Sequence, residues 1–393
     1  MSARPFVAAA AKAGYLVDAI DAFADAQTVA LAKMTMVVTC DNNGFNEESL
    51  LGLIGTLEAS QYLGFVYGSG FEAQPMLLQK IADIIPLIGN AAAQVLAIKT
   101  ASSFFSTLSL HNIPHPTSCE RLPQPDSRVE RYLQKFTGGS GGTHIKVAND
   151  GETLGFNHYF QQYMIGRSIS LLFLANSLEI KRVGFNELRL NPTSNLPFRY
   201  GGAVSNIELS FEVKQQMIHA AKTLTRQFGL LGLNSLDAIV KDEIVYVLEV
   251  NPRLSATVDL YSDDLYQDIN AKSIAYSNIM HLHILACLKG AEFQMTNVEE
   301  FSLLANSKVV KQSTAHAVIY ALEDTPLLAS FKWPNWAVDT PYFDEINNVH
   351  PDKLMVVLAN EPICTVLAHA EDANRAKVIV DARVESIQQI LKS

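Results

Sequence analysis

The sequence predicts an α/β protein, α+β in part, with more than one domain. Helix and strand signals alternate over the first ninety residues, which is typical of parallel sheets. From residue 156 onward strand signals follow one another more closely and end in a hairpin whose second strand is apolar but carries an acid. The chain has 393 residues, 48% of them hydrophobic, and can therefore bury large cores in two or three domains.

Charge and cysteine content narrow the class of protein. The formal net charge of −10 argues against a protein that binds nucleic acid mainly through phosphate contacts. No apolar run approaches the length of a membrane span. The four cysteines lie far apart and lack metal-ligand spacing, as expected of reduced thiols in the cytoplasm. We therefore expect a cytoplasmic protein that binds neither nucleic acid nor membranes.

Residues 1–89 predict a small parallel-sheet α/β domain. Lys12 interrupts the apolar N-terminal stretch and Gly14 ends it, so this stretch predicts a first helix rather than a signal peptide. Strands are expected over 15–23, 34–40, 63–70 and 83–90, and helices over 47–61 and 74–82. Such a domain normally begins with a strand, so its first strand is missing or the sheet is completed in another way.

A glycine-rich loop between two strands is the first candidate ligand site. A mostly helical region, 89–116, carries Lys99, and a proline-rich connector leads to a strand with Lys135 near its end. The glycines that follow are Gly138, Gly139, Gly141 and Gly142. Without β-carbons, backbone N–H groups can converge on an anion, and the lysine adds a full charge; a flexible hairpin tip is the alternative. The spacing matches neither a dinucleotide fingerprint nor a Walker loop.

The second candidate site lies in the stretch "VYVLEVNPRLSA", residues 245–256. Side chains alternate along a strand, so Glu249 and Asn251 are expected on one face. The same alternation assigns Val245 and Val247 to that face, and Tyr246, Leu248 and Val250 to the core face.

Asp237, in a strand expected over 228–240, is predicted to join this face. If the hairpin loop has three residues (241–243), Asp237 faces Val247 and lies diagonally from Glu249, whereas a two-residue turn would put the acid on the wrong side. Acids buried without a cation are costly or take up protons, and such oxygens suit Mg²⁺ held together with nucleotide phosphates. Two solvated carboxylates at a strand edge are the alternative. Arg253 could grip a transferring phosphate or a carboxylate.

Taken in order along the whole chain, these features resemble the ATP-grasp ligases. Lys99, Lys135 with its glycine loop, and "D…LEVNPR" are similar to the family's two nucleotide lysines, phosphate lid and metal hairpin. "QQYMIG" (161–166) resembles the hinge that grips adenine. The resemblance implies an ATP-grasp core over 90–289, preceded by the small α/β domain. It also implies a C-terminal α+β domain over 290–393, similar to the closing domain of carboxylase-like members.

The resemblance implies a role for each candidate residue. Lys99 and Lys135 would bind the α- and β-phosphates of ATP beneath the glycine lid, and Arg253 would act with Lys135 at the transferring phosphate. The adenine and ribose would contact Gln162, Tyr163, Met164 and Ser168. Mg²⁺, or Mn²⁺ in its place, would be held by Asp237, Glu249 and Asn251.

Three positions depart from the family pattern. Phe136 follows the loop lysine, where proline is usual. Gln162 replaces the hinge acid and keeps a hydrogen-bond acceptor without the charge. Ser168 stands where an acid commonly binds the ribose. The phosphate and metal ends of the site follow the pattern more closely.

The activity that the resemblance implies is ATP-dependent ligation of a carboxylate to an amine. The carboxylate attacks the γ-phosphate, and the amine then displaces phosphate from the acyl phosphate. The protein positions these groups and neutralises charge on the phosphoryl oxygens. Two alternatives stay open: a non-catalytic ATP-binding subunit, and a bicarbonate-activating carboxylase component.

Loops before the core resemble one subgroup of the family. "SARPFVAAAAKAGYLVDAIDAFAD" and "VYGSGFEAQPMLLQKIADIIPLIGN" are similar to the tyramine–glutamate ligases of methanofuran synthesis, beside one-carbon carriers such as tetrahydromethanopterin. This implies small-molecule carboxylate and amine substrates, with glutamate among them, and is compatible with a homodimer. Arg199 and Arg4 are the candidates for the second carboxylate of glutamate. Loops that could face substrate or phosphate also carry Ser69, Glu72, His144 and Tyr200.

Overall fold

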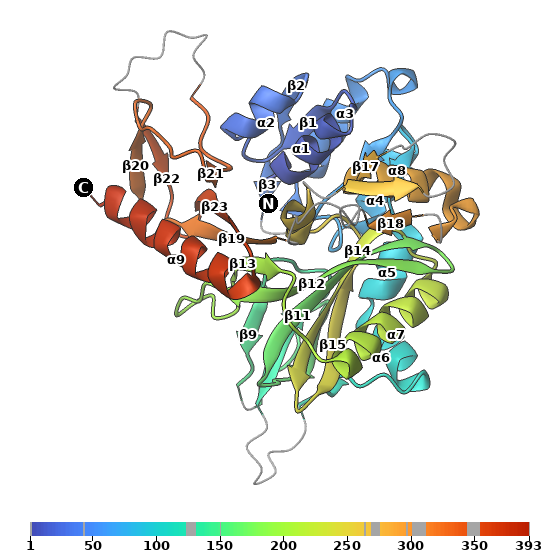
Figure 1. The fold of residues 1–393 in the computed structure, drawn as a ribbon. Helices are drawn as coiled ribbons and strands as arrows, with labels where there is room; N and C mark the ends of the chain where they lie inside the picture. Colours follow the sequence, from blue (N-terminus) through green and yellow to red (C-terminus); the bar gives the residue numbers. More distant parts are fainter. Residues whose placement is uncertain are drawn as a thin grey trace.

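Helices and sheets are layered around one large sheet, with the N-terminal elements at one end and the C-terminal helix along one side (Figure 1). The computed structural model describes residues 2–41, 44–122, 131–149, 151–262, 265–268, 276–295, 298–300, 312–343 and 354–392. Residues 123–130 of the predicted proline-rich connector lie outside these ranges.

The large sheet is antiparallel throughout. Among the described residues it has eight strands in the order β15, β14, β11, β12, β13, β19, β23 and β21. Their bounds are β11 Arg167–Asn176, β12 Ile180–Leu190, β13 Tyr200–Ser205, β14 Leu231–Lys241, β15 Ile244–Asn251, β19 Ser313–Tyr320, β21 Ala337–Val338 and β23 Pro362–Ala370. Because β13 pairs with β19, the sheet continues across residue 290, where the sequence analysis places a domain boundary.

Helix α7 (Phe211–Phe228) covers the sheet over β11, β12, β14 and β15. The hydroxyl of Ser210 accepts a hydrogen bond from the amide of Val213 and so caps the first turn. Gly229 ends the helix in the left-handed conformation, with φ 65°. Apolar residues at helical spacing in this segment therefore form one continuous helix.

The other helices extend the apolar packing. They are α5 Ala92–Lys99, α6 Ala101–Leu110, α8 Ile279–Lys289 and α9 Ala373–Ile390, with short 3-10 turns η2 Ala256–Tyr261 and η3 Gly290–Glu292. One buried core joins Phe104 of α6, Leu224 of α7, Val366 of β23 and Val380 of α9, so central and C-terminal elements share it. No helix in the described part is long and apolar enough to cross a membrane.

A second, smaller antiparallel sheet carries the glycine loop. Its order among the described strands is β7, β10, β8 and β9. The bounds are β7 Ser118–Cys119, β8 Tyr132–Phe136, β9 Ile145–Val147 and β10 His158–Gln162. Strand β8 contains Lys135 and β9 returns antiparallel to it, as the sequence predicts. This sheet and the large one bound the candidate site.

The N-terminal region begins with a helix and alternates helices with strands, as predicted. The elements are α1 Arg4–Lys12, β1 Asp18–Asp21, α2 Ala26–Leu31, β2 Met34–Val37, β3 Cys40–Asp41, β4 Gly44–Phe45, α3 Glu47–Gly55, η1 Ala59–Gln61, β5 Phe65–Val66, α4 Pro75–Ala82 and β6 Leu87–Ile88. Within the described residues the parallel strands form two separate pairs, β1 with β2 and β5 with β6, rather than one sheet, whereas β3 and β4 pair antiparallel. The strand predicted over 63–70 stops at Val66, and the chain then turns through Gly70, whose φ is 112°.

Short sheets complete the described part of the chain after residue 262. Strands β16 Leu265–Asp268, β17 Tyr276–Asn278 and β18 Val298–Glu300 form one sheet, and β20 Thr325–Leu328 pairs with β22 Leu354–Val357.

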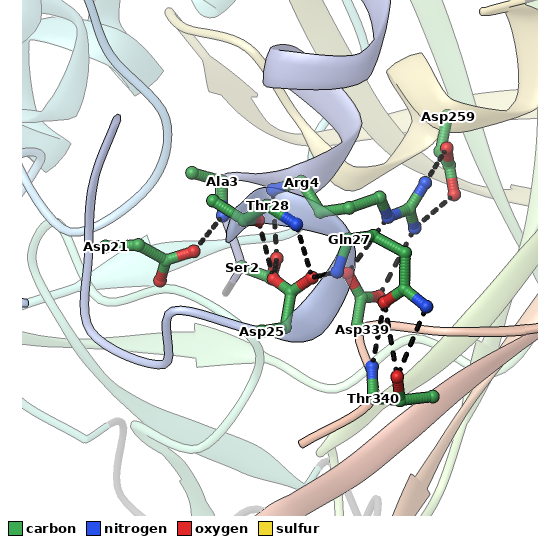
Figure 2. A network of polar contacts seen from close by, with 10 residues as sticks. All are labelled: Ser2, Ala3, Arg4, Asp21, Asp25, Gln27, Thr28, Asp259, Asp339 and Thr340. Atoms are coloured by element: carbon green, nitrogen blue, oxygen red, sulfur yellow. Dashed lines mark hydrogen bonds and ion pairs between the residues drawn. The ribbon is translucent and has the colours of Figure 1, made fainter. Parts of the chain in front are cut away.

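Arg4 anchors the N-terminal helix to both other parts of the molecule (Figure 2). Its buried guanidinium donates to Asp259 of η2 at 2.5 and 2.8 Å, and its Nε donates to Asp339 at 3.0 Å. Burial lowers the pKa of Arg4, but the two aspartates raise it above its usual value. Because two protein carboxylates already occupy this guanidinium, the geometry argues against the predicted role of Arg4 in binding a substrate carboxylate.

Asp25 extends this junction toward the C-terminal region (Figure 2). Its carboxylate accepts the hydroxyl of Ser2 at 2.7 Å and caps α2. In the first turn of α2, the side chain of Gln27 donates to the hydroxyl of Thr340 at 3.2 Å. The N-terminal region is therefore held by directional polar contacts as well as by packing.

Candidate functional site

The turn of the β14–β15 hairpin is shorter than predicted. Lys241 pairs with Ile244, so the turn contains only Asp242 and Glu243. Both have positive φ, 50° and 60°, as a tight two-residue hairpin turn requires. The three-residue loop predicted over 241–243 is therefore wrong.

A β-bulge nevertheless brings the two acids together. With this turn and regular pairing, Asp237 would lie opposite Leu248. The register shifts between Asp237 and Ala238, so that Asp237 lies directly opposite Glu249. One strand has an extra residue at this point, which is the definition of a bulge. The prediction of a shared face is confirmed, but the predicted diagonal relation is wrong.

The bulge also changes which side chains face the core. Val245 and Val247 are buried in the apolar core. The prediction that they share a face with Glu249 is therefore wrong. Tyr246 is half-buried, and Leu248 lines the cavity beside Glu249 instead of the core. Regular alternation fails here because the extra residue reverses the sides of the residues that follow.

A cavity of about 310 Å³ lies between the two sheets. That volume is at the lower end of the range for small-molecule sites, about 300–1,000 Å³. The predicted site residues that line it are Lys135, Gly141, Gly142, Gln162, Tyr163, Met164, Ser168, Asp237, Glu249, Asn251 and Arg253. Three other predicted residues, Lys99, Gly138 and Gly139, are not among the residues that line it.

Lys99 contacts two of the predicted metal ligands, Glu249 and Asn251. From the last turn of α5 its Nζ lies 2.7 Å from Oε2 of Glu249 and 3.3 Å from Oδ1 of Asn251. Burial alone would raise the pKa of Glu249, but Lys99 and Lys135 bring it well below the usual value. Glu249 is therefore ionised, and its side chain is 36% exposed to the cavity.

Asp237 has the opposite electrostatic situation. Burial and the nearby charge of Glu249 raise its pKa above the usual value. Its Oδ2 accepts the amide of Asn251 at 2.9 Å, and the hydroxyl of Ser170 opposes the rise in pKa, but the buried Oδ1 lacks a donor in good hydrogen-bond geometry among the described residues. A buried carboxylate oxygen without a donor is unfavourable, and a cation at this point would satisfy it.

The donor set fits a hard cation that keeps further ligands. No group of three or more His, Cys, Asp or Glu side chains is arranged to hold a metal in the described ranges. The site has two carboxylates and one amide, which suits Mg²⁺ when phosphates and water complete its shell.

The glycine loop is packed closely against two other segments. A β-carbon at Gly138 would lie 2.2 Å from the carbonyl oxygen of Glu72, and one at Gly142 would lie 1.9 Å from that of Phe198. The amide of Tyr200 donates to the carbonyl of Gly141 at 2.9 Å. The alternative of a free hairpin tip therefore does not describe this loop.

His144 and Lys135 bring ionisable groups beneath the loop. Burial lowers the pKa of His144 to about 4, so the ring is neutral at pH 7. Burial also lowers the pKa of Lys135, and Glu249 opposes that change. A β-carbon at Gly139 would collide with the ring of His144, so that glycine gives the ring room.

Arg253 has a buried partner that the sequence did not assign. Its Nε donates to Oε1 of Glu72 at 2.6 Å, and the two side chains are 4% and 1% exposed. Oε2 of Glu72 accepts the amide of Gly70 at 2.9 Å. From the sequence, Glu72 is predicted only to lie on a loop that could face substrate. An acid among glycines in "GSGFEA" was the one available signal, and it could not show the partner.

The hinge residues are held by backbone hydrogen bonds. The amide of Gln162 donates to the carbonyl of Thr117, and the amide of Tyr163 donates to that of Arg131, both at 2.8 Å. These bonds fix the segment in the lining of the cavity, to which Ser168 of β11 also belongs.

Comparison with known proteins identifies the fold. The family model described as the ATP-grasp domain matches residues 102–257. An uncharacterized protein of Methanocaldococcus jannaschii is 23% identical over 279 residues, which are 66% of this chain and 68% of that protein. The chain has the ATP-grasp fold, and residues 102–257 match the ATP-grasp domain, as its sequence features predict.

Solved structures of the same fold extend over nearly the whole chain. Biotin carboxylase from Campylobacter jejuni, in a β-γ-ATP complex, is 13% identical with a TM-score of 0.67, covering 95% of this chain and 87% of its own. L-amino acid ligase from Bacillus licheniformis is 14% identical with a TM-score of 0.62, covering 96% and 93%. N5-carboxyaminoimidazole ribonucleotide synthetase, in an ADP complex, is 13% identical with a TM-score of 0.60, covering 98% and 94%. At these identities the similarity shows the fold alone.

Proposed function

We propose that this protein is an ATP- and Mg²⁺-dependent ligase that joins a carboxylate to an amine through an acyl phosphate. The observation that carries the proposal is the pairing of Asp237 with Glu249 across a bulged hairpin, above a cavity that also receives Lys135 and Arg253. The fold similarity to an L-amino acid ligase supports the reaction class.

The cation would be held by Asp237, Glu249 and Asn251. Oδ1 of Asp237, which lacks a well-placed donor among the described residues, supports this assignment, because a cation would satisfy it. Mg²⁺, or Mn²⁺ with similar oxygen ligands, would neutralise charge on the phosphates when bound there. Lys99, which now contacts Glu249, would then turn toward the phosphates.

The nucleotide would lie in the cavity between the two sheets. Lys135 and the amides of Gly141 and Gly142 would contact its phosphates, beneath the loop from 138 to 142. The adenine and ribose would contact Gln162, Tyr163, Met164 and Ser168, which line the same cavity. A biotin carboxylase of this fold is known in a β-γ-ATP complex, which supports this placement.

Arg253 would hold the activated carboxylate. A guanidinium can hold two oxygens at once. Glu72 occupies Nε of Arg253, and a substrate carboxylate would replace the longer contacts of its Nη groups, to the carbonyl of Leu254 at 3.2 Å and Oδ1 of Asn251 at 3.3 Å. Glu72 would keep the side chain of Arg253 in one orientation, so that little side-chain entropy is lost when substrate binds.

We further propose glutamate as the acid, in the biosynthesis of a one-carbon carrier cofactor. Its support is the resemblance of "GSGFEA" and the N-terminal helix to glutamate ligases of that kind. A bicarbonate-activating component is the second candidate, favoured by the fold similarity to biotin carboxylase.

The test is ATP-dependent ADP release with a panel of acids and amines, with bicarbonate as a separate arm. Glu249→Gln should lower the rate about a hundredfold or more, because charge at the phosphates is then poorly neutralised. Glu243→Gln, in the exposed turn of the same hairpin, is the matched control and should retain activity. Turnover that is equal in both variants would refute the metal assignment. ADP release with bicarbonate alone would select the second candidate.

A further inference from the structure

A second and larger cavity adjoins the candidate nucleotide site. Its volume is about 480 Å³, and its walls come from the N-terminal, central and C-terminal parts of the molecule. The two cavities share the lining residues Ser140, Gly141, Tyr200 and Ala256. A molecule in the second cavity would therefore lie next to one in the first.

Arg199 is the unexplained charge in this cavity. It is 1% exposed, and its hydrogen bonds go to neutral oxygens: the carbonyl and side chain of Asn191 at 3.0 and 2.9 Å, and the side chain of Asn360 at 3.2 Å. The guanidinium also lies over the ring of Tyr320, 3.9 Å from its centroid. No carboxylate pairs with Arg199 among the described residues.

The second arginine of the cavity shows the contrast. Arg4 is similarly buried, but Asp259 and Asp339 neutralise it. Buried charges in proteins are normally paired, because an isolated charge loses its hydration without compensation. A guanidinium has five N–H groups, and three of those of Arg199 are used in the described part of the chain. An anion from outside the protein would complete its pairing.

The rest of the cavity surface suits an apolar stem beside that charge. Val318, Tyr320 and Ile363 line it, and the phenol of Tyr200 is hydrogen bonded to His316 at 2.7 Å. Burial lowers the pKa of His316 to about 4, so this ring adds no positive charge at pH 7. Arg199 is thus the one unneutralised cation among the described lining residues.

We propose that this cavity binds a dicarboxylic acid, of which Arg199 holds the carboxylate that does not react. The proposal rests on the proposed function, because it places the reacting carboxylate at Arg253 in the adjoining cavity. Arg199 thereby becomes the residue that selects an acid with a second carboxylate over one without it.

The same segment connects this site to the phosphate loop. The amide of Tyr200 donates to Gly141, and Gly142 packs on the carbonyl of Phe198. Phe198 and Tyr200 are the immediate neighbours of Arg199. An acid held at Arg199 would therefore also fix the backbone on which the glycine loop rests.

The first test uses the unmodified full chain. Calorimetric titrations in the presence of MgADP would compare succinate, glutarate, adipate and glutamate with the matching monoamides. We expect at least one diacid to bind about tenfold or more tightly than its monoamide, because the amide leaves the guanidinium unpaired. If no diacid is preferred over its monoamide, the proposal is wrong.

The second test uses variants at the arginine. Arg199→Gln should abolish the preference for the diacid, and Arg199→Lys, which keeps the charge, should retain part of it. Unchanged preference in a folded Arg199→Gln protein would also overturn the proposal, and would leave Arg199 as a structural link between Asn191 and Asn360.

These titrations contain no ATP, so they separate the two proposals. Binding that depends on Arg199 without any ADP release in the separate assay would keep the acid site and refute the ligase. ADP release with an acid whose affinity does not depend on Arg199 would do the opposite.

Discussion

At the scale of single residues, opposite environments divide the two acids of the hairpin. Glu249 is kept ionised by Lys99 and Lys135, whereas burial and Glu249 itself raise the pKa of Asp237. Two carboxylates in contact seldom both carry full charge without a cation. The two lysines therefore supply the positive charge beside Glu249 that a bound metal ion would otherwise provide.

Lys135 is the lysine whose loss should affect ATP most directly. Lys135→Met removes a buried cation beside the loop, and we expect ATP affinity to fall about tenfold or more. Isothermal titration calorimetry with ATP, and separately with MgADP, which is not turned over, would measure the affinity. Lys146→Met, on the neighbouring strand β9 and exposed, is the matched control. Equal affinities in the two variants would contradict the assignment.

At the scale of elements, the glycine loop and the hairpin show what local sequence could and could not predict. Their existence, order and strand type followed from glycine content and apolar patterning, and both are confirmed. The bulge was not predictable, because a single extra residue leaves the pattern around Leu248 looking regular. The contact between Arg253 and Glu72 was also hidden, since 181 residues separate them and only the folded chain brings them together.

Two glycines of the same loop should respond differently to alanine. Gly141 and Gly142 both have positive φ, 67° and 73°, so each substitution costs roughly 1–2 kcal/mol of backbone strain. Only Gly142→Ala also drives a β-carbon into the carbonyl of Phe198, while the space at Gly141 is open. We expect Gly142→Ala to lower ATP affinity and melting temperature much more than Gly141→Ala. Similar losses in both would show that the close contact is unimportant.

His283 should make stability depend on pH. From α8 its Nδ1 accepts the amide of Leu233 at 2.9 Å, and its Nε2 donates to the carbonyl of Ile88 at 3.2 Å. Burial lowers its pKa to about 4, so the unfolded chain binds the extra proton between pH 6.5 and 4. The contribution of the neutral His283 to the free energy of unfolding is therefore fully present at neutral pH. It is lost as the pH falls through that window, by about 1.4 kcal/mol per pH unit.

Melting curves at pH 7 and pH 5 would check this. His283→Asn should melt lower at pH 7 but lose less on acidification than the unmodified protein. His219→Asn, at an exposed position of α7, is the control and should keep the original pH response. An unaltered pH response in His283→Asn would exclude His283 as a cause.

At the scale of the whole molecule, three regions meet at one buried arginine. Arg4 belongs to α1, Asp259 to η2 and Asp339 to the C-terminal region, so the junction ties together segments far apart in the chain (Figure 2). The second cavity opens beside this junction. The spacing of its walls therefore depends on these contacts.

Arg4→Gln should destabilise the protein strongly. It leaves two buried carboxylates without their cation, and breaking such a group costs about 3–5 kcal/mol. Arg167→Gln breaks the exposed pair with Glu187 and should cost less than about 1 kcal/mol. Thermal melting of both variants measures the difference. A small effect of Arg4→Gln would show that the junction does not hold the regions together.

The pairing of β13 with β19 also bears on how the chain acquires its fold during synthesis. Gly202 of β13 lies so close to β19 that a β-carbon there would be 2.1 Å from the carbonyl oxygen of His316. Until β19 has emerged from the ribosome, β13 presents an open row of amides and carbonyls, and such an edge invites pairing with other chains. More than a hundred residues separate the two strands, so the central sheet remains incomplete for much of translation. A nascent chain stopped before β19 is therefore expected to aggregate, and chaperones that shield β-edges would act on it in that interval.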